Sequence, residues 1–156
     1  MHRPDELVEL YRAHGYKITP QRRAVFAVLD GNSEHPTAEA VHEAVIATMP
    51  NVSLRTVYSV LGELAEMGEI LQLDLGTRST RFDPNVGDHH HLVCKTCGRV
   101  RDVSVDTSAV RPAEGSTIDD FRIDGTEIVF RGECADHQPK SHRPNPTINT
   151  ERAIHG

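Results

Sequence analysis

The chain is poor in aromatic residues and contains no long apolar run. Tryptophan is absent and aromatics make up 4% of the 156 residues, so any hydrophobic core must be built from Val, Leu, Ile and Ala. No stretch reaches the roughly 18 consecutive apolar residues of a membrane helix, and the N-terminus lacks the apolar core of a signal peptide. These absences predict a cytoplasmic protein with no membrane partner.

Cysteine is also scarce, and its spacing is informative. Three cysteines are an odd number and poor material for a disulfide framework. Two of them, Cys94 and Cys97, form a C-x-x-C motif. A redox motif of the thioredoxin type would open a helix after a strand, whereas residues 95–98 are typical of a tight turn between strands. The spacing therefore favours reduced thiolates that bind zinc.

The charge of the chain is acidic overall but basic at its start. The formal net charge is -6, which argues against an indiscriminate nucleic-acid binder. Residues 1–29 carry five basic and three acidic side chains, which leaves a local charge of +2. A basic face on the N-terminal part therefore remains possible within an acidic whole.

The N-terminal half has the periodicity and capping residues of helices. Thr19 is placed to cap a helix that Gly31 stops. Thr37 is placed to start another helix, which Pro50 ends. Ser53 is placed to cap a further helix with an apolar stripe that includes residues 54, 57, 61 and 64.

The helices are followed by segments 69–75 and 77–83, which are typical of a hairpin joined around Gly76. Helices followed by a hairpin predict a winged helix-turn-helix, although any small helical bundle gives a similar pattern. The exposed face of the last helix favours the DNA-binding alternative, because its side chains can donate to phosphates and base edges. The predicted DNA-binding residues of this helix are Arg55, Thr56, Tyr58 and Ser59, of which Arg55 and Tyr58 are the candidates for reading bases. The predicted phosphate contacts are Lys17, Arg22 and Arg78.

From His89 onward the pattern changes to the period of two that indicates strands. Strands are expected at 90–95, 98–105, 121–123 and 127–133, with a broken helix at 107–119 that contains Pro112. The exposed edges of this part suit pairing with a second copy. The expected fold class is α+β, with a winged-helix DNA-binding domain at 1–82, a hinge at 83–88, a metal-binding dimerisation domain at 89–137 and a disordered tail at 138–156.

Four residues in the second half have the spacing of a structural zinc site. Three thiolates and one imidazole would satisfy tetrahedral zinc and leave no open position. The alternatives are that the cysteines are small buried hydrophobes and that the histidine is merely solvated. The predicted ligands are Cys94, Cys97, Cys134 and His137.

A second set of metal ligands lies close by in the sequence. On a strand, His89 and His91 project to one face and His90 to the other. Asp83 and Asp102 are placed to add carboxylates to the first two. Imidazoles and carboxylates suit metals such as iron or manganese, so one short stretch looks suited to two different metals. His35, taken alone, is more typical of a surface or capping residue.

Over roughly residues 7–137 these features resemble the ferric uptake regulator superfamily. The resemblance implies a homodimeric transcription factor whose N-terminal winged helix binds a palindromic double-stranded operator and whose C-terminal part dimerises. The matching segments are Thr19-Pro20-Gln21-Arg22, His35-Pro36-Thr37-Ala38-Glu39, Thr56-Val57-Tyr58, Arg81-Phe82-Asp83, Asp88-His89-His90-His91 and Cys94-Lys95-Thr96-Cys97-Gly98.

The resemblance also implies a regulatory metal, Fe(II) or Mn(II), beside the structural Zn(II). The implied ligands are His35, Asp83, His89, His91 and Asp102. With aspartate at positions 83 and 102, this ligand set resembles that of the peroxide-sensing branch of the family. In that branch, Fe(II) and hydrogen peroxide oxidise a ligand histidine, which by the match would be His35 or His89 here. The chain departs from the family pattern at His137, where cysteine is usual. It also lacks the histidine of a third site found in some members before the last strand.

Two alternatives remain open at this point. The first is a sensor of iron, manganese, zinc or nickel in the same superfamily without peroxide chemistry. The second is a zinc enzyme, but zinc deaminases need His-x-Glu and Pro-Cys-x-x-Cys, and the sequence contains neither. Four protein ligands would also leave the zinc no place for a water molecule. The sequence therefore favours a regulator and not an enzyme.

Overall fold

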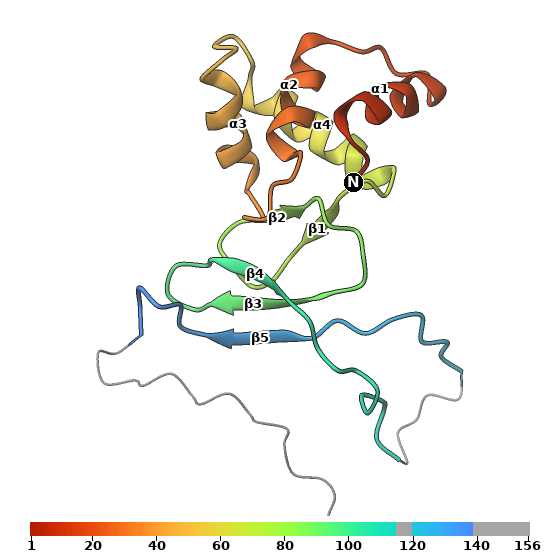
Figure 1. Cartoon of the computed structure of the whole chain (residues 1–156), viewed down its shortest axis with the longest axis vertical. Helices are drawn as coiled ribbons and strands as arrows, with labels where there is room; N and C mark the ends of the chain where they lie inside the picture. Colours follow the sequence, from red (N-terminus) through yellow and green to blue (C-terminus); the bar gives the residue numbers. More distant parts are fainter. Residues whose placement is uncertain (115–119, 139–156) are drawn as a thin grey trace, which may run out of the picture.

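The computed structural model describes residues 1–114 and 120–138. Within these residues, four helices gather at one end of the molecule and two small sheets lie below them (Figure 1). The helices are α1 (Pro4–Ala13), α2 (Pro20–Leu29), α3 (Ala38–Ile46) and α4 (Leu54–Glu66). The strands are β1 (Leu71–Leu73), β2 (Arg81–Asp83), β3 (His90–Cys94), β4 (Val100–Val103) and β5 (Val129–Gly132). No described helix is long and apolar enough to span a bilayer.

Three helices begin where the capping residues predicted. Thr19, Thr37 and Ser53 each occupy an N-cap, and each side-chain oxygen accepts a hydrogen bond from the backbone N–H three residues later. After α2 the chain turns at Gly31, whose φ of 66° lies in the left-handed region that favours glycine. These caps fix the loop between α2 and α3, and this loop carries His35.

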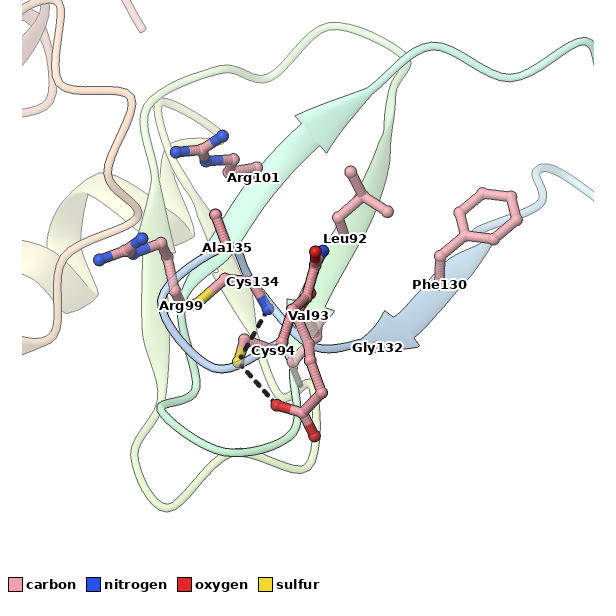
Figure 2. Close-up of a pocket in the computed structure, with 11 residues that line it drawn as sticks. Leu92, Val93, Cys94, Arg99, Arg101, Phe130, Gly132, Cys134 and Ala135 are labelled. Carbon is pink, nitrogen blue, oxygen red and sulfur yellow. Dashed lines mark hydrogen bonds between the residues drawn. The ribbon is translucent and has the colours of Figure 1, made fainter. Parts of the chain in front are cut away.

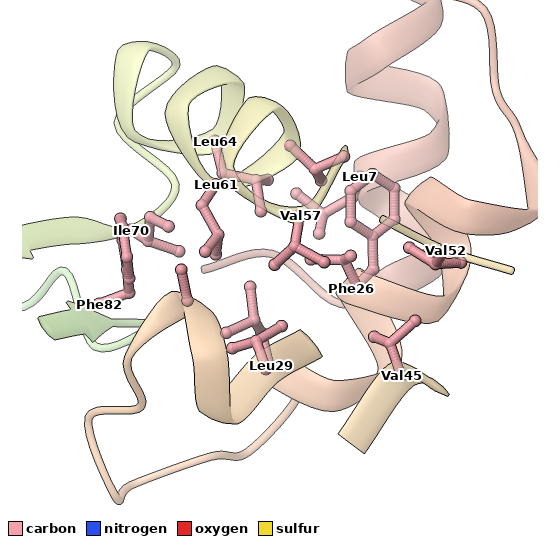
Figure 3. Close-up of a cluster of buried hydrophobic side chains, with 14 of the residues drawn as sticks. Leu7, Phe26, Leu29, Val45, Val52, Val57, Leu61, Leu64, Ile70 and Phe82 are labelled. Atoms are coloured by element: carbon pink, nitrogen blue, oxygen red, sulfur yellow. The ribbon is translucent and has the colours of Figure 1, made fainter. Parts of the chain in front are cut away.

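Among the described residues, the helices enclose a core that is mostly aliphatic (Figure 3), but the aromatic side chains of Tyr11, Phe26 and Phe82 are buried in it as well, contrary to the expectation of a purely aliphatic core. From α4, the fully buried positions include Val57, Leu61 and Leu64, as the apolar stripe predicted. Leu54 is only partly buried at the edge of the core, and Val60 is buried in addition. The stripe fixes which face of α4 is left to solvent.

Replacing Leu61 with alanine should lower the free energy of unfolding by about 2–5 kcal/mol, because the side chain is fully buried and the core can only partly close the cavity. Urea unfolding followed by circular dichroism measures the change. Leu54→Ala, on the same helix at the edge of the core, is the matched control and should cost less than half as much. An equal cost for the two variants would contradict the packing described.

The hairpin after α4 is an antiparallel pair of short strands. Leu71 of β1 lies opposite Asp83 of β2, and residues 74–80 form the connecting loop. The hairpin is therefore confirmed, but its strands are shorter than expected. The backbone N–H of Phe82 donates to the carbonyl of Pro36 at 2.9 Å. This bond places the loop that carries His35 against the end of β2.

A smaller core joins this hairpin to the C-terminal sheet. Leu73 and Leu75 from the hairpin pack with Val93 of β3 and Val100 of β4. The sheet itself has the order β4-β3-β5, with β4 antiparallel and β5 parallel to the central strand β3. His91 lies opposite Asp102 in the β3–β4 register. The register thus brings two predicted ligands together.

The helix expected at 107–119 is not formed in the described residues 107–114. The Asp106 carboxylate accepts the backbone N–H of Ser108 at 3.0 Å, and the N–H of Val110 donates to the carbonyl of Thr107 at 2.9 Å. These local turns compete with a helix, and Pro112 has no N–H to continue one. Residues 115–119 lie outside the described part.

The strand expectations near the C-terminus were partly wrong. Residues 121–123 are not a strand, and Phe121 is 76% exposed without a neighbouring strand in the described part of the chain. Alternation alone does not form a strand that has no pairing partner. The strand expected at 127–133 forms only from Val129 to Gly132. Apart from Gln138, the tail expected at 138–156 falls outside the described residues.

Candidate metal centres

Five side chains far apart in the sequence converge between the helices and the C-terminal sheet. Each offers one donor atom, and these atoms all lie within 4.8 Å of one another. They come from the loop before α3, from β2, from the segment before β3, from β3 and from β4. This set, the five-donor centre, consists of His35, Asp83, His89, His91 and Asp102.

The Asp83 carboxylate is the hub of the five-donor centre. Its Oδ2 atom lies 2.8 Å from His89 Nε2, 3.4 Å from His35 Nε2 and 3.5 Å from His91 Nε2. On the other side, Asp102 Oδ1 lies 2.7 Å from His35 Nε2 and 3.7 Å from His89 Nε2. Three imidazole nitrogens and two carboxylate oxygens therefore face a common point.

His35 is held in an unusual state. It is 1% exposed, and its φ of 49° is uncommon for a residue with a side chain. Although Asp102 Oδ1 is only 2.7 Å from its Nε2, the ring is not aligned to donate a hydrogen bond, and both ring nitrogens lack a partner within the described residues. A buried nitrogen without a partner is costly unless something else binds it. A metal ion at the common point would satisfy Nε2.

The charges of the centre are strongly coupled. Burial lowers the pKa of His35, but the nearby carboxylates of Asp83 and Asp102 favour its charged form, outweigh the effect of burial and raise the pKa above its usual value. Burial raises the pKa of Asp83, while His35 and the backbone N–H of Asn85 lower it to about 2. Asp83 is thus an anion at neutral pH. This negative charge favours the binding of a cation at the centre.

Neighbouring groups orient two of the imidazoles. His89 Nδ1 lies 2.7 Å from the Gly87 carbonyl, and His91 Nδ1 lies 3.3 Å from Glu127 Oε1. Each contact turns Nε2 of the same ring toward the centre. The sequence did not single out Gly87 or Glu127, since a backbone carbonyl leaves no signal and a lone glutamate is common.

His90 points away from the centre, as strand alternation predicted. Its Nδ1 accepts a hydrogen bond from the backbone N–H of Ile128 at 3.3 Å. That bond ties β3 to the segment that enters β5. His90 therefore has a structural partner and is absent from the five-donor centre.

The second cluster joins the end of β3 to the chain after β5. Cys97 Sγ lies 3.8 Å from Cys134 Sγ, and His137 Nδ1 lies 3.0 Å from Cys134 Sγ and 4.0 Å from Cys94 Sγ. One donor atom from each of the four residues lies within 4.8 Å of the others. All four residues predicted as zinc ligands are therefore brought together, and none of the cysteines is in a disulfide.

The thiols differ in acidity. The backbone N–H groups of Cys134 and Cys97 stabilise the thiolate of Cys94 and lower its pKa to about 6, and the Cys134 N–H lies 3.4 Å from Cys94 Sγ (Figure 2). Burial, followed by the neighbouring thiols, raises the pKa of Cys134. One thiolate is therefore already favoured, and a cation would be needed to hold three in so small a space.

The solvent face of α4 carries the side chains predicted to read DNA. Arg55, Tyr58 and Ser59 are exposed, whereas Thr56 is half-buried and lies 2.8 Å from Ser53 across their hydroxyl oxygens. The Tyr58 hydroxyl donates to Glu39 at 2.8 Å. This bond ties the face to α3 and limits what Tyr58 can offer to a partner.

Arg22 differs from the other predicted phosphate contacts. Its guanidinium forms two hydrogen bonds to Glu63, at 2.7 and 3.1 Å, and its side chain is only 17% exposed. The guanidinium also lies over the ring of Tyr16. Arg22 is thus paired inside the helical part, whereas Lys17 and Arg78 are exposed. The sequence could not reveal a partner 41 residues away.

Comparisons with known proteins agree on one family. A model described as the ferric uptake regulator family matches residues 13–131. The peroxide-responsive repressor PerR of Staphylococcus aureus is 30% identical over 139 residues, which cover 89% of this chain and 94% of that protein.

Solved structures support the same grouping. The ferric uptake regulator Fur of Helicobacter pylori, with its three functional metal binding sites, matches with a TM-score of 0.72 at 19% identity, over 91% of this chain and 100% of that chain. The structure of GAS PerR-Zn-Zn matches with a TM-score of 0.51 at 26% identity, over 92% of each chain. The mixed helix and sheet architecture expected from the sequence is thereby confirmed.

Proposed function

Because this chain belongs to the ferric uptake regulator family of metal-responsive transcription regulators, we propose that it is a metal-dependent repressor that responds to hydrogen peroxide. It would bind a palindromic operator as a homodimer. The five-donor centre is the observation that carries the proposal, because three imidazoles and two carboxylates converge there and His35 Nε2 has no hydrogen-bond partner among the described residues. The similarity to a peroxide-responsive repressor supports the choice of signal.

The donor set fits Fe(II) or Mn(II) as the regulatory metal. Imidazole nitrogen and carboxylate oxygen are borderline and hard ligands, and no thiolate is among them. Two features favour a cation at the common point: the Nε2 atom of His35 has no hydrogen-bond partner among the described residues, and the Asp83 carboxylate is ionised. His35, His89 and His91 would bind through Nε2, and each aspartate would bind through the oxygen that faces them.

The cysteine cluster fits a structural Zn(II). Cys94, Cys97, Cys134 and His137 supply the four donors of a tetrahedral site and leave no position for water or substrate. Such a site would tie the end of β3 to the chain after β5. A Cys3His set is chemically sound although the family pattern usually ends in cysteine.

Metal binding and closure of the hinge would be one event. His35 lies before α3 in the helical part, whereas His91 and Asp102 lie on the C-terminal sheet. A metal that contacts all three binds tightly only when the two parts are together, so it shifts the population toward that arrangement. In a dimer, this arrangement would hold two α4 helices about 34 Å apart, one turn of DNA.

DNA recognition would use the exposed face of α4. Arg55 and Tyr58 are the proposed base-reading residues, with Thr56 and Ser59 beside them on the same helix. Lys17 and Arg78 remain the proposed phosphate contacts, because both are exposed. Arg22 is removed from this set, since Glu63 holds its guanidinium.

The peroxide response would follow from the choice of metal. When bound, Fe(II) supplies the one-electron reduction of hydrogen peroxide that generates a short-lived oxidant, and Mn(II) does not. By the family resemblance, the ring that is oxidised would be that of His35 or His89, and both rings face the centre through Nε2. Oxidation of either ring would remove a ligand and release the hinge.

The test is to expose the Fe(II)-loaded and Mn(II)-loaded proteins to hydrogen peroxide and to map added oxygen by peptide mass spectrometry. One oxygen atom is expected on His35 or His89 in the Fe(II) form only, together with loss of DNA binding. His14, which is exposed at the C-terminal end of α1 and is not among the five donors, serves as the internal control and should stay unmodified. If neither histidine gains oxygen while DNA binding still depends on metal, the protein senses metal without peroxide chemistry.

A further inference from the structure

Asn85 makes three hydrogen bonds in the turn that follows β2. Its backbone N–H donates to Asp83 Oδ1 at 2.8 Å, and its side-chain Nδ2 donates to Asp102 Oδ2 at 2.8 Å. Its side-chain Oδ1 accepts the backbone N–H of Gly87 at 3.2 Å. Although the residue is exposed, its amide group is therefore held on both sides.

These bonds divide the oxygens of the two carboxylates in the same way. Asp83 turns Oδ2 toward the imidazoles, and Asp102 turns Oδ1 toward His35. The remaining oxygens, Asp83 Oδ1 and Asp102 Oδ2, are the ones that accept hydrogen bonds from Asn85. An oxygen that is occupied by an N–H donor on the outer side of a carboxylate is withdrawn from the centre. Each aspartate is thus set to offer a single oxygen.

The third bond connects Asn85 to an imidazole. Gly87 is anchored through its N–H by Asn85, and its carbonyl lies 2.7 Å from His89 Nδ1. A carbonyl at that distance favours the tautomer with the proton on Nδ1, which leaves Nε2 free to bind metal. Through this turn, Asn85 touches or supports three of the five donors.

We infer that Asn85 is a positioning residue of the five-donor centre: its side chain holds Asp102 as a one-oxygen ligand and supports the orientation of His89, and its backbone N–H holds Asp83 in the same way. The inference rests on the proposed metal site. Asn85 itself binds no metal. It acts through the ligands, because its hydrogen bonds already restrict their conformations before a cation binds. Less conformational entropy is then lost on metal binding.

A double-mutant cycle measures this action directly. The Mn(II) dissociation constant is determined by competition with a chelator for the wild type, Asn85→Ala, Asp102→Ala and the double variant. Asn85→Ala should weaken Mn(II) binding about tenfold. In the Asp102→Ala background the same substitution should cost about threefold or less, since its principal partner is already gone. The electron paramagnetic resonance spectrum of bound Mn(II) should change in Asn85→Ala, because Asp102 is released.

Two further variants separate positioning from loss of structure. Asn51→Ala removes an exposed loop amide that makes no side-chain hydrogen bond among the described residues, and should leave Mn(II) binding unchanged. Asn85→Ser keeps an oxygen that can accept the Gly87 N–H but is too short to reach Asp102. Asn85→Ser should therefore retain the fold, and its Mn(II) binding should be weakened almost as much as in Asn85→Ala, because the hydrogen bond to Asp102 is lost in both variants.

The outcomes distinguish this inference from the proposed metal site. If Asp102→Ala weakens Mn(II) binding but Asn85→Ala and Asn85→Ser stay within about twofold of the wild type, the role of Asn85 is overturned and the site stands. An equal loss in both backgrounds would also overturn it, because Asn85 would then support only the loop. If Asp102→Ala leaves binding unchanged, the proposed metal site is itself wrong.

Discussion

Replacing Cys97 with serine should abolish zinc retention and unfold the C-terminal sheet. The four-donor cluster would lose a thiolate, and a serine hydroxyl is a poor substitute because it stays protonated at neutral pH. The sheet has three short strands and a small core shared with the hairpin, so it has little else to stabilise it. A structural zinc contributes about 10–16 kcal/mol of apparent binding free energy in small domains. Cys97 is exposed, so serine itself should not disturb the packing.

Metal analysis and limited proteolysis measure this effect together. The variant should retain almost no zinc, and cleavage should spread through residues 90–138, while the helices keep their circular dichroism signal. Ser104→Ala, at an exposed position just after β4, is the control and should retain zinc and resist cleavage. Retention of one zinc per chain with unchanged proteolysis would show that Cys97 is not a ligand.

Replacing Asp83 with alanine should weaken Mn(II) binding by more than about 100-fold, beyond the range for residues that only support a ligand. Its Oδ2 lies within 3.5 Å of the Nε2 atoms of three histidines, so its loss affects the surroundings of all three imidazoles. Its low pKa keeps it charged at neutral pH, and its loss removes half of the carboxylate charge. Operator binding should fall to the level of metal-free wild type.

Asp83→Asn and Asp106→Ala complete this experiment. Asparagine keeps the shape but not the charge, and should therefore lose most of the Mn(II) affinity while the fold is preserved. Asp106→Ala removes an exposed carboxylate outside the centre and should bind Mn(II) like the wild type. Asp83→Asn that binds Mn(II) as tightly as the wild type would contradict the role of this carboxylate.

The helical part of the fold was predictable because its signals are local. Thr19, Thr37 and Ser53 cap their helices within three residues of themselves, and such bonds follow from the sequence alone. The segment after residue 106 was not predictable in the same way. There the Asp106 carboxylate and Pro112 favour turns, and these weigh more than a weak helical pattern.

In the two candidate metal centres, too, the features that follow from local sequence patterns were predictable, and those that depend on distant contacts were not. Alternation along residues 89–91, at the start of β3, was sufficient to separate His89 and His91 from His90. The entry of His35 depends on a backbone bond from Phe82 to Pro36 across 46 residues, so only the family resemblance indicated it. Asn85 and Glu127 act through side-chain contacts over 17 and 36 residues, for which a single sequence has no signal.

The central claim is that a metal in the five-donor centre controls DNA binding and that peroxide reverses this control through Fe(II). The most direct measurement is fluorescence anisotropy with a duplex selected from a random pool by the Mn(II)-loaded protein. Binding should weaken about 100-fold when the regulatory metal is chelated. Hydrogen peroxide should cause a similar loss with Fe(II) and none with Mn(II). Equal binding with and without metal would contradict the account.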